Sequence, residues 1–151
     1  MKSFLPICID VSYGKIVIIG GGKVALQKLK TILKYSNNVF LYAKEIIPDI
    51  LILPVICTKE EYNLNQITDA LLVYACTNDP KLNLRICEDA RRNGSLVNIA
   101  DDSENSDFIS PAIFFHKGMS IAVSSNGLYV KKSIKWRNAI KEFILNDFNG
   151  R

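Results

Sequence analysis

The stretch IVIIGGGKVALQKL, from Ile16 to Leu29, decides the fold that this sequence predicts. Four bulky aliphatic residues lead into three consecutive glycines. A near-continuous aliphatic run is typical of a strand in a parallel sheet that is covered on both faces. After the glycines, Ala25, Leu29 and Ile32 recur at helical spacing. The stretch therefore predicts a strand over residues 15–19, a tight turn and a helix.

The glycines fit a pattern that is typical of dinucleotide binding. Gly20, Gly22 and Ala25 satisfy G-x-G-x-x-[G/A] between a strand and a helix. The first glycine allows the turn, the second lets a pyrophosphate approach the backbone, and the small third residue permits close helix packing. The helix would offer N–H groups and its positive dipole end to phosphates. We therefore predict that Gly20, Gly22, Lys23 and Val24 bind a cofactor, the alternative being a tight turn without ligand.

The end of the second predicted strand bears on the choice of cofactor. NAD-binding folds usually carry an Asp or Glu there, which holds the ribose hydroxyls. Here the strand over residues 39–43 is followed by Lys44 and Glu45. Glu45 lies slightly beyond the usual position of that acid. Lys44 could bind a 2′-phosphate, or it could be an ordinary surface residue. Both are candidate cofactor contacts. We name NAD as the cofactor, although these residues alone leave NADP open.

Strands and helices alternate along the rest of the first part of the chain. Apolar runs predict three further strands, over residues 54–58, 70–77 and 95–100. Asp79 and Pro80 predict the start of a helix that Gly94 ends. Such alternation predicts right-handed βαβ units around a parallel sheet. The expected class is therefore α/β, with a Rossmann-type NAD-binding domain over residues 1–111.

The segment over residues 112–151 follows a different pattern. AIFFH and MSIAVSS flank Lys117-Gly118, which is a two-residue hairpin signal, and a helix is predicted over residues 131–147. The helix carries four apolar residues on one side: Trp136, Ile140, Phe143 and Ile144. A unit of about 40 residues cannot build an independent core. We therefore expect a small dimerisation and substrate-cleft segment, and a homodimer.

Composition argues against several classes of function. Four cysteines form no C-x-x-C pair, and there is one histidine, so we expect buried free thiols and no metal site. No apolar run reaches the ~18 residues of a membrane span, and the N-terminus makes a poor signal peptide. The net charge of +4 comes without a nucleic-acid motif. We expect a cytoplasmic protein that binds neither membrane nor nucleic acid.

Four segments in order resemble those of the precorrin-2 dehydrogenases, the N-terminal module of siroheme synthases. FLPICIDVSYGKIVIIGGGK resembles the opening of that family, and YACTNDPKLN resembles its segment after the fourth strand. LVNIADD resembles its segment after the fifth strand. SDFISPAIFFHKGMSIAVSSNG is similar to its D-F-I-x-P-A run, hairpin and serine turn. The resemblance extends from residue 4 to about residue 140.

The resemblance implies NAD-dependent oxidation of precorrin-2 to sirohydrochlorin in siroheme biosynthesis, with ferrochelatase activity in some members. Asp101 aligns with the key aspartate of the family and follows the fifth strand, at the edge where open sheets bind ligands. Hydride transfer to a nicotinamide requires loss of a proton, which a carboxylate can accept. We therefore predict that Asp101 is catalytic, the alternative being that Asp101 or Asp102 caps a turn. Thr77 ends the fourth strand, where the nicotinamide ribose should lie.

The implied substrate is a tetrapyrrole that carries many carboxylates and therefore needs cationic and polar neighbours. The candidate substrate-binding residues are Asn98, Ser124, Ser125, Asn126 and Lys132, the alternative for Asn98 being that its side chain holds the loop. The family usually has two glycines after the serines and a proline soon after. Here Asn126-Gly127-Leu128 follows, so the loop that would place the substrate is altered.

Two other functions remain open. The glycine turn is similar to that of the nucleotide-sensing NAD-binding modules of potassium transport systems. Those modules normally keep an acid at the tip of the second strand, and they lack the D-F-I-x-P-A run of residues 107–112. The other alternative is a tetrapyrrole-binding, chelatase-only member that does not oxidise its ligand.

Overall fold

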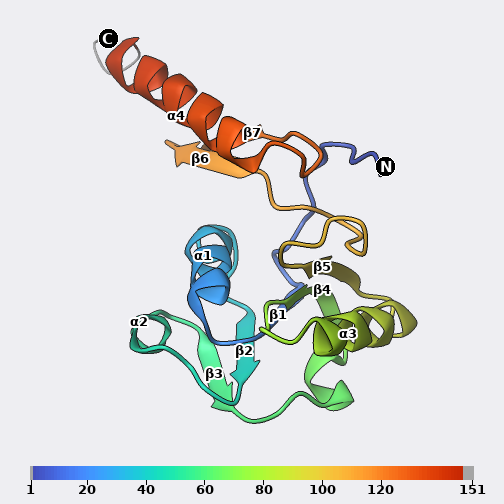
Figure 1. Ribbon diagram of the computed structural model, residues 1–151. Helices are drawn as coiled ribbons and strands as arrows, with labels where there is room; N and C mark the ends of the chain where they lie inside the picture. The colour runs from blue at the N-terminus through green and yellow to red at the C-terminus, as the bar shows by residue number, and fades with distance from the viewer. Residues whose placement is uncertain (1, 148–151) are drawn as a thin grey trace. The chain divides into compact units, whose positions relative to one another are not determined.

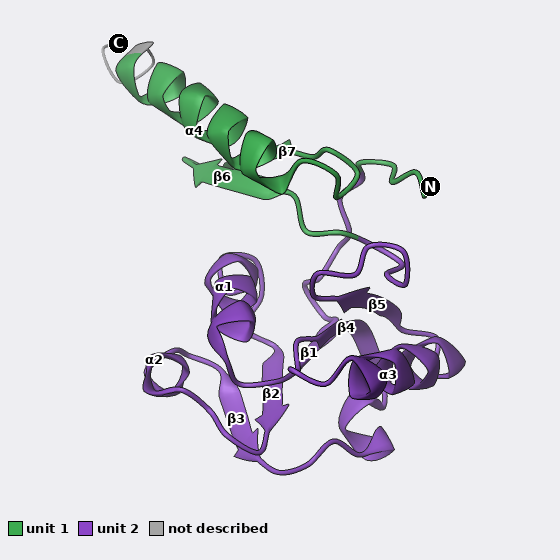
Figure 2. Cartoon of the chain, viewed as in Figure 1, with its two compact units in different colours: residues 1–6, 109–151 green, residues 7–108 purple. Residues whose placement is uncertain are grey.

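The computed structural model describes residues 2–147, and these form two compact units. The sheet unit comprises residues 7–108, and the hairpin unit comprises residues 2–6 and 109–147 (Figure 2). The first residues of the chain thus group with its last third. The functional assignment of residues 1–111 to NAD binding and of residues 112–151 to dimerisation and substrate stays a prediction.

The sheet unit is built on five parallel strands in the order β3-β2-β1-β4-β5 (Figure 1). The strands are β1 Lys15–Ile19, β2 Val39–Ala43, β3 Ile56–Lys59, β4 Ala70–Ala75 and β5 Leu96–Ile99. The strand order reverses between β1 and β4, and open α/β sheets bind ligands at such a point. The expected α/β class with a Rossmann-type sheet is confirmed.

A hydrophobic cluster covers each face of the central strands, as the aliphatic strands predicted. The helical segments of this unit are α1 Lys23–Ile32, α2 Pro48–Leu51, the 3₁₀ turn η1 Leu64–Ile67 and α3 Pro80–Arg92. Side chains alternate between the two faces of each strand. Ile16 and Ile18 pack with Leu29 of α1, whereas Val17 packs on the other face with Ile86 of α3.

The boundaries of α3 follow the predicted signals. Asp79 Oδ1 accepts hydrogen bonds from Lys81 N at 2.9 Å and Leu82 N at 3.3 Å, and Pro80 is the first helical residue. At the other end Gly94 has a φ of 79°, and Ser95 N donates to the Ala90 carbonyl at 2.9 Å. This is the glycine-terminated helix end that the sequence predicted.

Three strands differ in their bounds from the prediction, and two short elements were not predicted. β5 covers Leu96–Ile99 rather than residues 95–100. β3 begins at Ile56 rather than at residue 54, where a proline cannot donate to a sheet. β4 ends at Ala75 rather than at residue 77, because the chain turns there toward the α3 N-cap. α2 and η1 have four residues each and are too short to give a periodic signal in the sequence.

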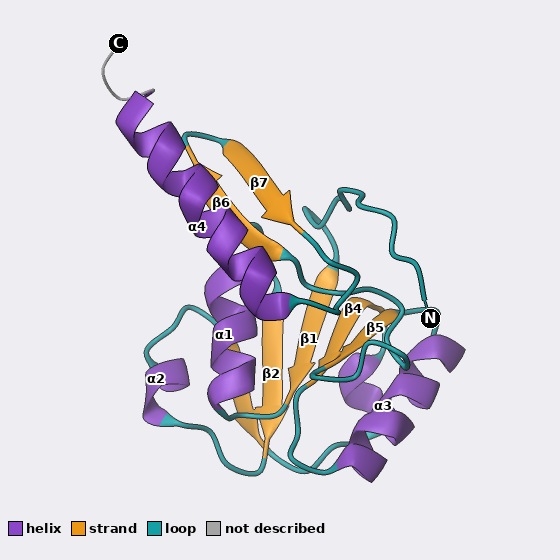
Figure 3. Ribbon diagram, turned by 45° about the horizontal axis from the view of Figure 1, so that its top comes forward, coloured by secondary structure: helices purple, strands orange, loops and turns teal. Residues whose placement is uncertain are grey.

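The hairpin unit contains β6 Ala112–His116, β7 Met119–Val123 and α4 Val130–Asp147. Lys117 and Gly118 have φ of 49° and 79°, the conformation of a two-residue hairpin turn. Figure 3 shows α4 lying alongside the hairpin, and Arg137 Nη1 donates to the Ile113 carbonyl at 2.7 Å. The predicted hairpin and final helix are confirmed. Among residues 2–147, no helix has both the length and the apolar character needed to cross a membrane.

Candidate functional site

Gly20 lies where the carboxyl ends of three strands meet. Its φ is 122°, which favours glycine, and a Cβ there would overlap the carbonyl group of Cys76. Its N–H donates to the Tyr42 carbonyl at 2.9 Å, while Cys76 N donates to the Ile19 carbonyl at 2.8 Å. The turn after β1 is therefore tight because β2 and β4 both pack against it.

Gly21 has a structural role that the sequence pattern does not include. A Cβ at this position would overlap the Glu45 carbonyl oxygen. The Gly21 carbonyl also accepts a hydrogen bond from Ile47 N at 3.0 Å. The loop after β2 thus packs directly on the glycine turn. This close approach requires the middle glycine, which the G-x-G-x-x-[G/A] pattern leaves unspecified.

Gly22 faces open space at the start of α1. No heavy atom of the described chain lies within 4 Å of the place that a Cβ would take. Within that same part of the chain, no side chain caps α1, and its first turn carries no acid. The N–H groups of the first turn, which includes Lys23 and Val24, therefore lack a side-chain acceptor. This cradle fits the phosphate groups of a dinucleotide.

Lys44 is paired with a residue that the sequence analysis did not consider. Its Nζ lies 2.7 Å from Glu61 Oε1. The Glu61 side chain raises the pKa of Lys44, and Lys44 in turn lowers the pKa of Glu61. Both side chains are exposed, so the pair adds little stability. Glu45 is exposed, and its backbone lies against Gly21.

Thr77 is fixed just beyond β4 by Asn83 of α3. Thr77 Oγ1 donates to Asn83 Oδ1 at 2.7 Å, and Asn83 Nδ2 donates to the Thr77 carbonyl at 3.0 Å. Asn83 is buried, which makes this pair of bonds a firm anchor. A Cβ on Gly20 would lie 3.1 Å from Thr77 N. Thr77 is therefore next to the glycine turn at the switch point.

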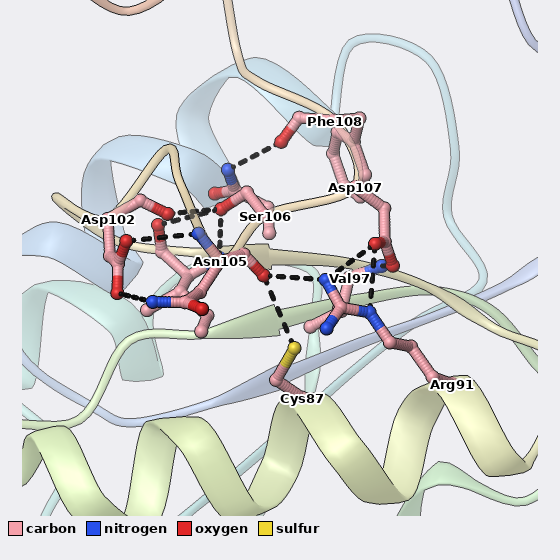
Figure 4. Close-up of polar contacts among 10 residues, drawn as sticks. Cys87, Arg91, Val97, Asp102, Asn105, Ser106, Asp107 and Phe108 are labelled. Carbon is pink, nitrogen blue, oxygen red and sulfur yellow. Dashed lines mark hydrogen bonds and ion pairs between the residues drawn. The ribbon is translucent and has the colours of Figure 1, made fainter. Parts of the chain in front are cut away.

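Asp101 begins the loop that follows β5, and its φ of 62° is left-handed. Aspartate tolerates this region better than most residues, at a cost of roughly 1 kcal/mol. The turn itself is closed by its neighbour: Asp102 accepts from Asn105 N at 3.1 Å and from Asn105 Nδ2 at 2.7 Å (Figure 4). Of the two aspartates, Asp102 is thus the turn cap.

Buried polar bonds hold residues 101–108 on β5 (Figure 4). Ser106 is fully buried, and its Oγ accepts from Ile99 N at 2.8 Å and donates to the Asp102 carbonyl at 2.7 Å. Asp107 Oδ2 accepts from Val97 N at 3.1 Å, in the place that a sixth strand would take. The sequence analysis missed Ser106, since a single serine in a polar loop gives no pattern.

The same loop is also tied to α3. Arg91 donates to Asp107 Oδ1 through Nε at 2.9 Å and Nη2 at 2.7 Å, and to the Asn105 carbonyl at 2.9 Å (Figure 4). The hydrogen bonds to Asp107 raise the pKa of Arg91. Cys87 Sγ lies 3.3 Å from the Asn105 carbonyl. The backbone of Asp101 is therefore positioned by a loop anchored on two elements.

Asn98 is a buried polar residue on β5. Its Nδ2 donates to the Phe108 carbonyl at 2.9 Å, which holds the end of the loop. Its Oδ1 is buried and has no hydrogen-bond partner within residues 2–147. Buried acceptors are rarely left unpaired, and such an atom is a candidate contact for a donor group of a ligand or for water.

The remaining predicted substrate residues come together in the hairpin unit. Ser125 Oγ accepts from Tyr129 N at 3.0 Å and bonds to Ser133 Oγ at 3.0 Å, ahead of α4. Ser124 Oγ lies 3.4 Å from Asn126 N, and Asn126 has a φ of 53°. Lys132 lies over two aromatic rings. Its Nζ is 6.0 Å from the ring centroid of Tyr129 and 5.4 Å from that of Trp136.

The remaining reactive side chains are the metal-ligand types and the cysteines. The structure, over residues 2–147, contains no group of three or more His, Cys, Asp or Glu residues that could hold a metal ion. All four cysteines are free, but the expectation that they are buried holds for only two of them. Cys76 and Cys87 are buried, whereas Cys8 is exposed.

Residues 7–112 match the sequence model of a family described as "Putative NAD(P)-binding". This match covers more than half of the chain, and the glycine turn, the switch point and the uncapped start of α1 all lie within it. The chain belongs to this family of NAD(P)-binding domains.

Similar proteins include siroheme synthases. That of Actinobacillus pleuropneumoniae serotype 3 is 31% identical over 129 residues, covering 83% of this chain and 26% of the relative. That of Buchnera aphidicola subsp. Acyrthosiphon pisum is 32% identical over 129 residues, with coverage of 83% and 27%. The chain therefore spans about a quarter of the length of these relatives.

A solved structure titled "SirC, precorrin-2 dehydrogenase" has the same fold. Its TM-score is 0.78 at 16% identity, and the match covers 92% of this chain and 70% of that chain. The structural match thus covers more of this chain than residues 7–112, which match the NAD(P)-binding family. The solved structure and the siroheme synthases agree with the resemblance drawn from the four sequence segments.

Proposed function

We propose that this chain oxidises precorrin-2 to sirohydrochlorin, with NAD⁺ as hydride acceptor, in siroheme biosynthesis. The observation that carries this proposal is the position of Asp101. It begins an anchored loop at the carboxyl edge of the sheet whose switch point carries the glycine turn. The similarity to siroheme synthases and to a solved precorrin-2 dehydrogenase supports the choice of substrate.

The glycine turn and its neighbours would hold the cofactor. Gly22 and the N–H groups of Lys23 and Val24 would bind the pyrophosphate, because this start of α1 is open and uncapped. Glu45 would bind the adenosine ribose, and Thr77 the nicotinamide ribose. NAD⁺ supplies a two-electron hydride acceptor when bound.

The pairing of Lys44 favours NAD over NADP. A 2′-phosphate needs a cation whose charge is available. Here the Glu61 carboxylate lies 2.7 Å from Lys44 Nζ, and its negative charge would repel a 2′-phosphate at this place.

Asp101 would accept the proton that accompanies hydride loss. The substrate loses two hydrogens overall, one as hydride to NAD⁺ and one as a proton to the carboxylate. The left-handed backbone at Asp101 and the anchored loop fix the position of the Asp101 backbone, from which the carboxylate side chain extends. Asn98 would orient the substrate or the nicotinamide through its unpaired Oδ1.

The hairpin unit would supply substrate contacts and the subunit interface. Ser124, Ser125, Asn126 and Lys132 offer hydrogen-bond donors and one cation for substrate carboxylates. Trp136 and Ile140 of α4 are exposed apolar residues, as a surface for a second copy requires. We therefore propose a homodimer.

The proposal is tested by anaerobic incubation of the purified protein with precorrin-2 and NAD⁺. The visible spectrum should change to that of sirohydrochlorin, and the change should require NAD⁺. An Asp101→Asn variant that still binds NAD⁺ should lose most of this rate. NAD⁺ binding without tetrapyrrole binding would instead favour the sensor module. Insertion of Fe²⁺ into added sirohydrochlorin without any oxidation of precorrin-2 would favour a chelatase-only protein.

A further inference from the structure

Asn83 of α3 is a polar residue inside the sheet unit, with 6% of its surface exposed. Its side-chain amide binds both backbone groups of Thr77: Oδ1 accepts from Thr77 N at 3.2 Å, and Nδ2 donates to the Thr77 carbonyl at 3.0 Å. These two bonds decide which side-chain atom is the oxygen, since a reversed amide would set donor against donor and acceptor against acceptor. The orientation of the Asn83 amide is therefore fixed by the backbone of Thr77.

The orientation of Asn83 determines how the hydroxyl of Thr77 is used. A hydroxyl has one hydrogen to donate and two lone pairs that accept. Thr77 Oγ1 lies 2.7 Å from Asn83 Oδ1 and 3.2 Å from the Asp79 carbonyl oxygen, and both of these oxygens are acceptors. One lone pair of Thr77 Oγ1 accepts from Asp79 N at 3.2 Å. The single hydrogen is thus used within the chain, and the second lone pair of this partly exposed residue is left for a ligand.

The position of Thr77 beside the glycine turn connects this lone pair to the cofactor. A Cβ on Gly20 would lie 3.1 Å from Thr77 N, at the switch point where a dinucleotide is expected. The ionised pyrophosphate of a dinucleotide only accepts hydrogen bonds, whereas a ribose hydroxyl can donate one. A threonine hydroxyl whose hydrogen is already used therefore suits a ribose and not a phosphate.

We propose that Asn83 is a positioning residue for the cofactor: it holds the Thr77 hydroxyl as a hydrogen-bond acceptor, which binds a donating hydroxyl group of the nicotinamide ribose. This inference rests on the proposed function, which assigns that ribose to Thr77. Asn83 forms no bond to the cofactor in this scheme. It acts through Thr77, because its bonds fix both the backbone of that residue and the direction of its hydroxyl hydrogen.

The first test compares NAD⁺ with ADP, which lacks the nicotinamide ribose, by calorimetric titration of the whole chain. Thr77→Val removes the hydroxyl at nearly constant volume, so the Kd for NAD⁺ should rise about fivefold while the Kd for ADP is unchanged. Thr77→Ser keeps the hydroxyl and should bind NAD⁺ within about twofold of wild type. An unchanged Kd for NAD⁺ in Thr77→Val would overturn the proposal.

The second test asks whether Asn83 acts through that hydroxyl. Asn83→Ser should raise the Kd for NAD⁺ about fivefold and leave the Kd for ADP unchanged. Adding Asn83→Ser to Thr77→Val should change the Kd for NAD⁺ by less than about twofold. Equal losses of NAD⁺ and ADP affinity in Asn83→Ser would show a general structural role and overturn the proposal, as would additive losses in the double variant.

Asn93→Ser is the matched control for Asn83→Ser. Asn93 Nδ2 also donates to a backbone carbonyl, that of Ile67 at 2.8 Å, but Asn93 is the C-cap of α3, at the opposite end of the helix from Thr77. This variant should lower the Tm without changing the Kd for NAD⁺. A loss of stability alone is thus distinguished from a loss of cofactor positioning.

The third test uses NAD⁺ analogues that carry fluorine in place of the 2′- or the 3′-hydroxyl of the nicotinamide ribose. Fluorine cannot donate, so one of the two analogues should bind wild type about fivefold more weakly than NAD⁺, with no further loss in Thr77→Val. Full affinity of both analogues would overturn the proposal. A wild-type chain that binds neither NAD⁺ nor ADP would overturn the proposed function and this inference together. The expected binding results in a chain that leaves precorrin-2 unoxidised would support the inference and overturn the proposed reaction alone.

Discussion

The three consecutive glycines have three different surroundings, although they are identical in sequence. Gly20 has a positive φ and lies against the Cys76 carbonyl, and Gly21 lies against the Glu45 carbonyl. Gly22 alone of the three has open space where a side chain would begin. Two of the glycines are thus required by close packing of the chain, and the third is available to a ligand.

Alanine substitutions should separate these roles. Gly21→Ala places a methyl group on the Glu45 carbonyl and should reduce the free energy of unfolding by roughly 1–3 kcal/mol, from overpacking. Gly22→Ala should leave the Tm unchanged but weaken NAD⁺ binding about tenfold, because its methyl group occupies the approach to the phosphates. Thermal unfolding and calorimetric titration with NAD⁺ measure the two effects. Equal stability of Gly21→Ala and wild type would contradict the assignment.

Cys76 should make the stability of the protein depend on pH. Burial raises its pKa to about 12 from the ordinary value of 9.0. Between these values the unfolded chain releases the thiol proton while the folded chain keeps it, so stability falls as pH rises. From about pH 8 to about pH 10, wild type should lose about 1 kcal/mol more unfolding free energy than Cys76→Ala. Denaturant titrations measure this, with the exposed Cys8→Ala as a control that retains the loss.

At the scale of elements, the parts with local signals were predictable. The α3 N-cap at Asp79, its end at Gly94 and the Lys117-Gly118 hairpin turn each follow from residue types with defined backbone preferences. The loop over residues 101–108 was not predictable in this way. Its structure depends on Ser106 and Arg91, which bond to backbone groups brought close only by the folded sheet.

Ser106 should be the residue on which this loop depends most. Ser106→Ala leaves Ile99 N–H without its buried acceptor and should cost about 1–3 kcal/mol of unfolding free energy. Amide hydrogen exchange over residues 101–108 should accelerate, and precorrin-2 oxidation should slow with it. Ser103→Ala is the control in the same loop and should leave all three measurements near wild type. Unchanged exchange in Ser106→Ala would show that the loop is held by other contacts.

At the scale of the whole molecule, the sequence predicted the fold more completely than the site. The α/β class and the parallel sheet followed from the aliphatic runs and from the glycine turn at Gly20, whereas the order of the strands was not predicted. The partner of Lys44 did not follow, because Glu61 is distant in sequence. The position of Lys28 Nζ, 5.8 Å from the centroid of the Tyr74 ring, also did not follow from the pattern, since a lysine on an amphipathic helix is expected to face solvent. The sequence pattern carries no information about contacts between residues that are far apart in the chain.

The exposed side of α4 should form the interface of a homodimer. Ile140→Glu places a charge among exposed apolar residues that would be buried by a second copy, so the dimer should weaken at least about tenfold. Asn138→Glu adds the same charge on the opposite side of the helix and should leave the dimer intact. Sedimentation velocity across a concentration series measures both. A wild-type protein that is monomeric at micromolar concentrations would contradict the proposal.

The central claim is that a hydride from precorrin-2 reduces NAD⁺ on this chain. It is tested most directly by mixing the protein anaerobically with precorrin-2 and excess NAD⁺, and comparing NADH formed, from its near-ultraviolet absorbance, with tetrapyrrole oxidised. We expect one NADH for each sirohydrochlorin, at a rate that falls sharply in Asp101→Asn. Tetrapyrrole and NAD⁺ that both bind without any formation of NADH would contradict it.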